Sequence, residues 1–169
     1  SLSDLGFRRS GKHFYRPYCE NCHACTPIRV NAHLFTPTKS QKRILKKNSE
    51  IKIQILSADF HEDHYLLYDG HLCAIAVCDQ LDDGLSAIYT FFDPDYSSLS
   101  LGKHAILWQI EEAKKRNLKY LYLGYFIKNC RKMAYKNQYS PFEARINNQW
   151  FTENQLEDLA KEASKNLVQ

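Results

Sequence analysis

The sequence predicts an α+β layer fold, in which helices cover an antiparallel or mixed sheet. Three observations lead to this class. Apolar runs separated by Asp-Gly turn signals predict an antiparallel meander between residues 65 and 92. A helix with one apolar face follows the meander, and the apolar run Tyr120–Phe126 then predicts a strand that returns to the sheet.

The strands of the meander have clear turn signals between them. Before the meander, Ile51, Ile53 and Ile55 occupy alternate positions, which favours a separate strand. The runs 65–68 and 72–78 flank Asp69-Gly70, a pair typical of two-residue hairpins. A second turn at 82–84 leads into the run 85–92, which completes the meander.

Two helices are expected after the meander. The first follows the Ser-rich loop 97–100, because apolar residues share one face and charged residues the other; the apolar ones are Ile106, Leu107, Ile110 and Ala113. The second begins near Glu153, where Thr152 and Gln155 have the spacing of a capping box. Its narrow apolar stripe predicts a terminal helix.

The first 38 residues lack helical periodicity and are rich in Cys, His, Pro and aromatic residues. The basic stretch 39–47 that follows is expected to be a loop or one short helix with its charges in solvent. We therefore divide the chain into a small Cys-containing lobe, residues 1–50, and a second domain, residues 51–169.

Charge and composition narrow the possible functions. The chain has 169 residues and a net charge of +4, but residues 1–50 carry +7, residues 51–100 carry −8 and residues 101–135 carry +6. Basic blocks of this kind favour a polyanionic partner if the fold brings them together. No apolar run approaches the roughly 20 residues of a membrane helix, so a cytoplasmic location is the expectation. Common hydrolase and nucleotide-binding motifs are absent from the sequence.

The cysteine spacing points to a metal. Cys19, Cys22 and Cys25 form a doubled C-x2-C, and close thiols in a cytoplasmic chain favour zinc or an iron–sulfur cluster over disulfides. The fourth ligand stays open, with His23 and His13 as candidates. A redox pair and three buried thiols are the alternatives.

Three further groups are candidates for anion binding. The loop 97–102 opens into a helix, so its N–H groups can face an anion or a carbonyl group. Residues 128–136 mix bases with an aromatic residue, which suits phosphates and stacking. Arg8 and Arg9, with Lys12 nearby, form a possible fork for a carboxylate.

Several motifs, in order along nearly the whole chain, resemble the aminoacyl-tRNA-protein transferases of the N-degron pathway of protein degradation. The residues that carry the resemblance are G-F-R-R-S-G-K-H-F-Y-R-P-Y-C-E-N-C-H-A-C-T-P-I-R-V (6–30), F-T-P-T-K-S-Q-K-R (35–43), D-D-G-L-S-A-I-Y-T-F-F-D-P-D (82–95), S-L-G (100–102), Y-L-Y-L-G-Y-F-I (120–127) and K-M-A-Y-K (132–136). The C-x2-C-x2-C spacing is similar to that of the bacterial aspartate/glutamate leucyltransferases. The segment between Lys47 and His64 looks shorter than is usual in the family.

The resemblance implies an acyltransferase that moves leucine from leucyl-tRNA to the α-amine of proteins beginning with Asp or Glu. It also implies an N-acetyltransferase-like (GNAT-like) fold for residues 51–169, and no cofactor for the transfer itself. On this reading Arg8, Arg9 and Lys12 bind the acidic acceptor, and Asp93, Tyr89 and Ser100 are the catalytic candidates. The expected aminoacyl-tRNA contacts are Leu101, Gly102, Lys128, Lys132, Tyr135 and Lys136, with the basic segment 39–47 beside them.

Three other functions stay open. Arginine is the alternative transferred residue, because eukaryotic members of the family use it. An acetyl-CoA-dependent N-acetyltransferase needs a glycine-rich phosphate loop, and residues 99–105 contain only Gly102. A non-catalytic, metal-containing RNA-binding module would bind RNA without preferring charged tRNA.

Overall fold

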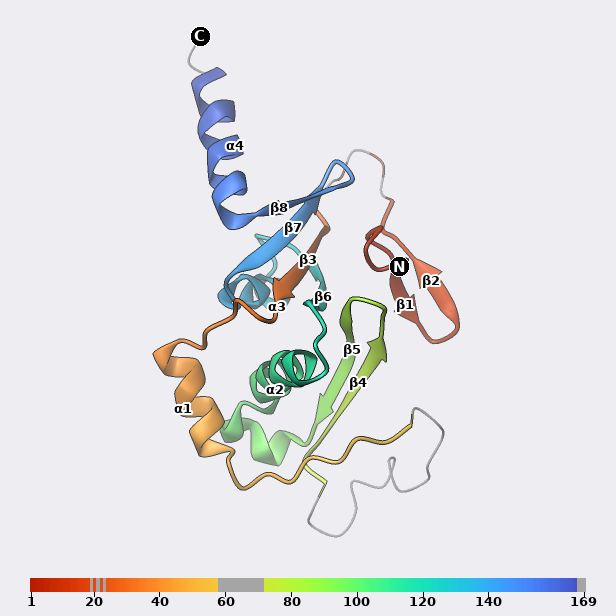
Figure 1. Ribbon diagram of the computed structural model, residues 1–169, viewed down its shortest axis with the longest axis vertical. Coiled ribbons are helices and arrows are strands. Elements are labelled where there is room, and N and C mark those ends of the chain that lie inside the picture. Colours follow the sequence, from red (N-terminus) through yellow and green to blue (C-terminus); the bar gives the residue numbers. More distant parts are fainter. Residues whose placement is uncertain (19, 21, 23, 58–71, 167–169) are drawn as a thin grey trace.

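The computed structural model describes residues 1–166 except 19, 21, 23 and 58–71. Its centre is a mixed six-stranded sheet in the order β4-β5-β6-β3-β7-β8 (Figure 1). The strands are β3 (Thr26–Asn31), β4 (Ala74–Gln80), β5 (Gly84–Phe92), β6 (Tyr120–Phe126), β7 (Phe142–Ile146) and β8 (Gln149–Thr152). A separate two-stranded sheet pairs β1 (Arg8–Ser10) with β2 (His13–Tyr15).

Helices connect and cover the strands. They are α1 (Lys39–Lys47), α2 (Leu101–Lys115), α3 (Arg131–Ala134) and α4 (Glu153–Asn166), with the 3-10 helices η2 (Pro94–Leu99) and η3 (Tyr135–Gln138). Together with the sheet they confirm the predicted mixed α+β class. Within the described residues, no helix is long and apolar enough to cross a membrane.

The core lies between α2 and the sheet. Ile106, Leu107 and Ile110 of α2 are almost fully buried, and they belong to one cluster with residues of β3, β5 and β6, namely Ile28, Val30, Leu85, Leu121 and Leu123. Burying an aliphatic side chain of this size contributes about 1.5–3 kcal/mol. The apolar face that the sequence predicts for this helix is therefore confirmed.

The sheet contains one parallel pair. β5 and β6 run in the same direction, whereas the other neighbouring strands are antiparallel. A parallel pair needs a crossover, and α2 supplies it. The β5–α2–β6 unit agrees with the predicted strand, helix and returning strand.

The amino-terminal third of the chain also contributes to this sheet. β3 lies between β6 and β7, and its residues Ile28 and Val30 are buried in the core. Sequence reasoning did not identify this strand, because its six residues stand among Cys, His and Pro. The sheet thus combines residues from both sides of the predicted boundary at residue 50.

Other local predictions had mixed outcomes. The strand expected at 51–55 is wrong, since residues 51–57 form no regular element; Ile53 and Ile55 are exposed, and no strand among the described residues pairs with them. The strand expected at 65–68 and its Asp69-Gly70 turn lie outside the described residues. The β4–β5 hairpin is confirmed, and so is the terminal helix α4.

The segment 39–47 is a helix because Thr38 and Gln41 form a reciprocal capping box. At α4 the cap is one-sided: the Thr152 N–H and hydroxyl both donate to Gln155 Oε1, at 2.9 and 3.0 Å. The β7–β8 hairpin, which was not predicted, turns at Asn147 and Asn148, both with positive φ. Two consecutive asparagines favour a type I′ turn, so this pair is the sequence signal from which the hairpin could have been predicted.

Candidate active site

β5 and β6 pair over three residues only and then separate. Gly84, Leu85 and Ser86 are paired with residues 120–122, after which β5 continues beside β4 and β6 continues beside β3. The two strands approach so closely where their pairing begins that position 84 requires a glycine. A Cβ at Gly84 would collide with the Tyr120 carbonyl oxygen. We call the point after Ser86, where the two strands part, the β5–β6 fork.

Arg8 of β1 occupies this fork. Its guanidinium donates to Ser86 Oγ at 3.0 Å and to the Ala87 carbonyl oxygen, both on β5. On the β6 side it packs against Gly124, where a Cβ would lie 3.2 Å from Arg8 Nε. Gly124 also has φ +84°, a conformation that glycine adopts without strain.

Arg8 makes no ion pair in the described part of the chain, and Asp79, the carboxylate that acts on it electrostatically, is already paired with Arg9. The residue is 8% exposed, and its two acceptors are a hydroxyl and a carbonyl oxygen. Burial lowers the pKa of its guanidinium, although an arginine stays cationic at neutral pH. A buried cation with only neutral partners is costly, and an incoming carboxylate would compensate it.

Lys136 is a half-buried cation close to Arg8. Its Nζ donates to the Tyr125 carbonyl oxygen at 2.8 Å, one residue beyond Gly124, and it makes no ion pair with a described residue. Burial, with a smaller contribution from the Arg8 charge, lowers the pKa of Lys136 to about 8. Arg8 and Lys136 thus place two positive charges, neither in an ion pair with a described residue, against Gly124 and Tyr125, consecutive residues of β6.

The β1–β2 hairpin that carries Arg8 is docked on β4 and β5 by the next two residues. Arg9 forms a bidentate pair with Asp79 of β4, with Nε–Oδ2 and Nη2–Oδ1 distances of 2.6 Å. The Ser10 hydroxyl lies 2.9 Å from the Tyr89 hydroxyl of β5. Arg9 therefore already has a carboxylate partner, whereas Arg8 does not.

The other expected catalytic residues lie farther along β5. The Asp93 carboxylate accepts from the Asp95 N–H and caps η2. Asp93 lies six positions beyond Ala87, about 20 Å in an extended strand. Ser100 begins α2 in a left-handed conformation, Leu101 is buried, and Gly102 lies near the Phe92 ring.

The remaining candidates for tRNA contact follow β6. Lys128 and Lys132 are exposed, and Tyr135 is half-buried against the core. Lys12 is exposed at the turn of the β1–β2 hairpin. Thus the structure brings Arg8, Tyr89 and Lys136 to the part of β5 and β6 around the fork, and it leaves Asp93 and residues 100–102 at the far end of β5.

Sequence reasoning missed three residues of this site. Asp79 and Ser86 become partners of Arg9 and Arg8 only through pairing across 70 or more residues. Gly124 had a local signal, because a glycine inside an apolar strand marks a bulge or a close approach. The register shift between Ile28 and Arg29, opposite Gly124 and Tyr122, is that bulge.

The predicted metal ligands are only partly described. Cys22 is exposed and Cys25 is half-buried, while Cys19 and His23 lie outside the described residues. Among the residues that are described, no three His, Cys, Asp or Glu side chains gather as a metal site. Thiol pairs with this spacing suit zinc or an iron–sulfur cluster, so the metal stays a prediction.

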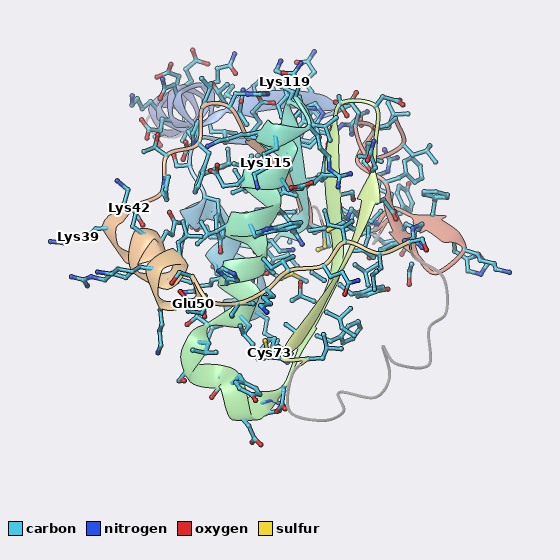
Figure 2. All side chains as sticks on the ribbon, turned by 60° about the horizontal axis from the view of Figure 1, so that its bottom comes forward. Lys39, Lys42, Glu50, Cys73, Lys115 and Lys119 are labelled. Carbon is cyan, nitrogen blue, oxygen red and sulfur yellow. The ribbon has the colours of Figure 1, made fainter. Side chains whose placement is uncertain are left out.

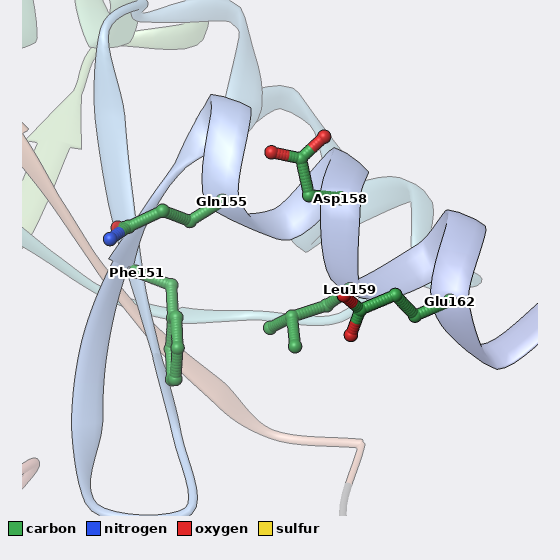
Figure 3. A pocket seen from close by; sticks show the side chains of 5 residues that line it. All are labelled: Phe151, Gln155, Asp158, Leu159 and Glu162. Carbon is green, nitrogen blue, oxygen red and sulfur yellow. The ribbon is translucent and has the colours of Figure 1, made fainter.

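A pocket at the opposite edge of the sheet has different chemistry. It lies between β8 and α4 and is lined by Phe151, Gln155, Asp158, Leu159 and Glu162 (Figure 3). Its carboxylates would repel both an acidic acceptor and RNA. The β5–β6 fork, with its two cations, is therefore the candidate active site.

Comparisons with known proteins identify relatives over most of the chain. Residues 12–146 match the family described as "Arginine-tRNA-protein transferase, C terminus". The chain is 43% identical over 192 positions to "Aspartate/glutamate leucyltransferase" of Pseudomonas putida (strain GB-1), covering 90% of this chain and 82% of that protein. The protein of the same name from Saccharophagus degradans is 42% identical over 191 positions, covering 89% and 81%. These alignments are longer than the 169-residue chain, so the relatives contain positions without a counterpart here.

Proposed function

The chain belongs to the arginine-tRNA-protein transferase family, and on that premise we propose that it transfers leucine from leucyl-tRNA to the α-amine of proteins beginning with Asp or Glu. The relatives named for this activity support leucine rather than arginine as the donor residue. Charged tRNA is made and used in the cytoplasm, which is where we place the reaction.

The observation that carries this proposal is the buried Arg8 guanidinium. It has neutral hydrogen-bond partners, and Lys136 adds a second positive charge beside it. Such a site would discriminate strongly between acceptors with and without an acidic side chain, because an acceptor without a carboxylate would leave both cations unpaired. This arrangement supports an acceptor with an acidic side chain.

We assign the acceptor's side-chain carboxylate to Arg8 and Lys136. Arg9, which was expected to share this role, instead holds the hairpin through Asp79 and thereby positions Arg8. Lys12, on the exposed turn, is free to contact residues farther along the acceptor chain. In this scheme Arg8 and Lys136 touch substrate, whereas Arg9 acts through the hairpin.

The reaction is aminolysis of an ester. The uncharged α-amine attacks the leucyl carbonyl carbon, the new amide bond forms, and the ribose oxygen of the terminal adenosine leaves and takes up a proton. Because the ester is already activated, holding the amine near the carbonyl supplies much of the rate. The nearby positive charges also disfavour the ammonium form of the acceptor and so favour the reactive amine.

We place the aminoacyl end of the tRNA along β5 toward the start of α2. The backbone N–H groups of Leu101 and Gly102, in the first turn of α2, have no acceptor within the helix and suit an anionic or carbonyl oxygen. Ser100, with its left-handed backbone, orients this start, and Tyr89 and Asp93 stay candidates for proton handling on β5. Lys128 and Lys132 would hold phosphates, and Tyr135 would contact the terminal base. The β5–α2–β6 crossover with its short parallel pairing also supports an N-acetyltransferase-like fold.

The metal proposal concerns structure rather than the transfer step. Cys22 and Cys25, with Cys19, would hold zinc or a cluster that organises the segment between β2 and β3. Metal analysis of the purified chain tests this. A cluster would add a visible absorption band that zinc lacks, and metal-free protein that keeps its Tm and activity would contradict the proposal.

A transfer assay tests the proposed function directly. Labelled leucyl-tRNA and arginyl-tRNA are each incubated with the chain and peptides that begin with Asp, Glu or Ala. We expect leucine only on the Asp and Glu peptides. Arginine in its place would change the donor residue, and binding of tRNA without transfer would favour the non-catalytic RNA-binding module.

A further inference from the structure

One face of α1 carries an uncompensated row of positive charges. At 100° per residue, its cations fall within an arc of about 140°, opposite the face that contacts the core. They are all exposed, and they are Lys39, Lys42, Arg43, Lys46 and Lys47. Lys39 and Lys42 extend from α1 into solvent in Figure 2. The opposite face contains Gln41 and Asn48, both buried, with Ile44 and Leu45 between them.

Repulsion within this cationic face opposes the stability of its own helix, although Lys46 and Lys47 lie in the last turn, where the helix dipole favours positive charge. The segment has no acidic residue, and its cations stand three and four positions apart, where like charges repel. Lys39 and Lys42 lie near the amino-terminal end, where the helix dipole disfavours positive charge. In the described part of the chain no carboxylate pairs with any of them. A polyanion would supply the missing compensation.

α1 is tied to both segments that the proposed function assigns to tRNA. At its carboxyl end, Lys47 Nζ donates to the Ser98 carbonyl oxygen at 2.9 Å, and Asn48 Nδ2 donates to that of Leu99 at 3.0 Å. These residues immediately precede α2. Nearer its amino end, Gln41 Nε2 donates to the Gln138 carbonyl oxygen at 2.9 Å, just beyond residues 128–136. These contacts place α1 beside the expected path of the tRNA, and Lys47 connects its cationic face directly to the segment before α2.

We propose that the cationic face of α1 binds backbone phosphates of the tRNA acceptor stem and leads the aminoacyl end toward the start of α2. This inference rests on the proposed function and adds a surface to it. The face holds no aromatic residue on which an unpaired base would stack, so the double-stranded stem is the part of the tRNA that it suits.

The test compares two charge-matched variants of the full chain. Lys42→Gln/Lys46→Gln removes two charges from the face, and Lys115→Gln/Lys161→Gln removes two exposed charges elsewhere. We expect the first variant to raise the KM for leucyl-tRNA roughly tenfold at physiological salt and to flatten the slope of log KM against log salt by roughly 2. Its KM for the Asp peptide should not change. Its Tm should not fall, because like-charge repulsion is removed.

Equal KM values and equal salt slopes in the two variants would overturn the proposal. So would a raised KM in Lys42→Arg/Lys46→Arg, which keeps the charges. Failure of the wild type to transfer leucine would reject the proposed function and leave this surface open to the same comparison. Filter binding of tRNA to the same variants would then test the surface. We expect tRNA affinity to fall in Lys42→Gln/Lys46→Gln and not in Lys115→Gln/Lys161→Gln, and equal affinities would overturn the proposal.

Discussion

Arg9 and Asp79 form a bidentate ion pair between the β1–β2 hairpin and β4, with both N–O distances at 2.6 Å. Both side chains are about one-quarter exposed, so the pair contributes little to global stability, on the order of 1 kcal/mol. Its larger consequence is positional, because the residue immediately before Arg9 in β1 is Arg8.

Breaking this pair is expected to impair acceptor binding more than folding. Asp79→Asn should raise the KM for an Asp peptide severalfold, leave the KM for leucyl-tRNA unchanged and lower Tm by only a few degrees. The swapped variant Arg9→Asp/Asp79→Arg should recover part of the loss. An unchanged peptide KM in Asp79→Asn would show that the pair does not position Arg8.

Arg8 should determine selectivity for acidic acceptors. Arg8→Met removes the buried cation, and we expect kcat/KM for Asp and Glu peptides to fall by about 100-fold or more, a loss equivalent to 3 kcal/mol. Tm should change by only a few degrees, because loss of the costly buried cation offsets loss of its hydrogen bonds to Ser86 and Ala87. Retained preference for Asp over Ala peptides in Arg8→Met would contradict the assignment.

Gly124 should tolerate no side chain. A Cβ there would lie 3.2 Å from Arg8 Nε, and φ +84° is unfavourable for alanine. We expect Gly124→Ala to lower both Tm and the peptide kcat/KM. Gly11→Ala is a matched control with φ +56° and open space around the new methyl group. Equal kcat/KM losses in both variants would mean that displacement of Arg8 is not the cause.

Lys136 should make acceptor binding depend on pH. Its pKa is lowered to about 8, so it is cationic below that pH and loses its charge above it. After correction for ester hydrolysis, kcat/KM for Asp peptides should fall above about pH 8, and Lys136→Arg should extend the plateau. Identical alkaline limbs in both proteins would exclude Lys136 as the titrating group.

Arg29 should be a main source of stability outside the site. Its guanidinium lies 3.7 Å from the Tyr120 ring centroid and 4.1 Å from that of Trp150, and it pairs with Asp4 and Glu143. Arg29→Met would leave the largely buried Glu143 unpaired, at a cost of about 3 kcal/mol or roughly 6–12 °C in Tm. Lys161→Met, which breaks an exposed pair, should change Tm by less than about 2 °C. Equal thermal shifts in the two variants would contradict this ranking.

Sequence periodicity was sufficient to predict an element where the residues of that segment alone show the spacing of a helix or a strand. The apolar face of α2, the strand β6 and the β4–β5 hairpin follow from local spacing, because each pattern matches the geometry of one element. The motifs around Arg8, Tyr89 and Lys136 likewise identified the family, since order and residue type are properties of the chain itself. The alternation at 51–55 led to a wrong prediction, because a strand also needs a second strand to pair with, and a local pattern cannot show whether one is present.

What only the tertiary structure decided is which side chains share a charge environment. Arg8 and Arg9 are adjacent and chemically identical in the sequence, yet one meets a carboxylate on β4 and the other meets only neutral oxygens on β5. Lys136 resembles the exposed Lys128 and Lys132 until burial lowers its pKa. Burial and long-range pairing are properties of the packed sheet, so the sequence determined the family and most elements, while the fold distinguished the residues that we propose bind the acceptor.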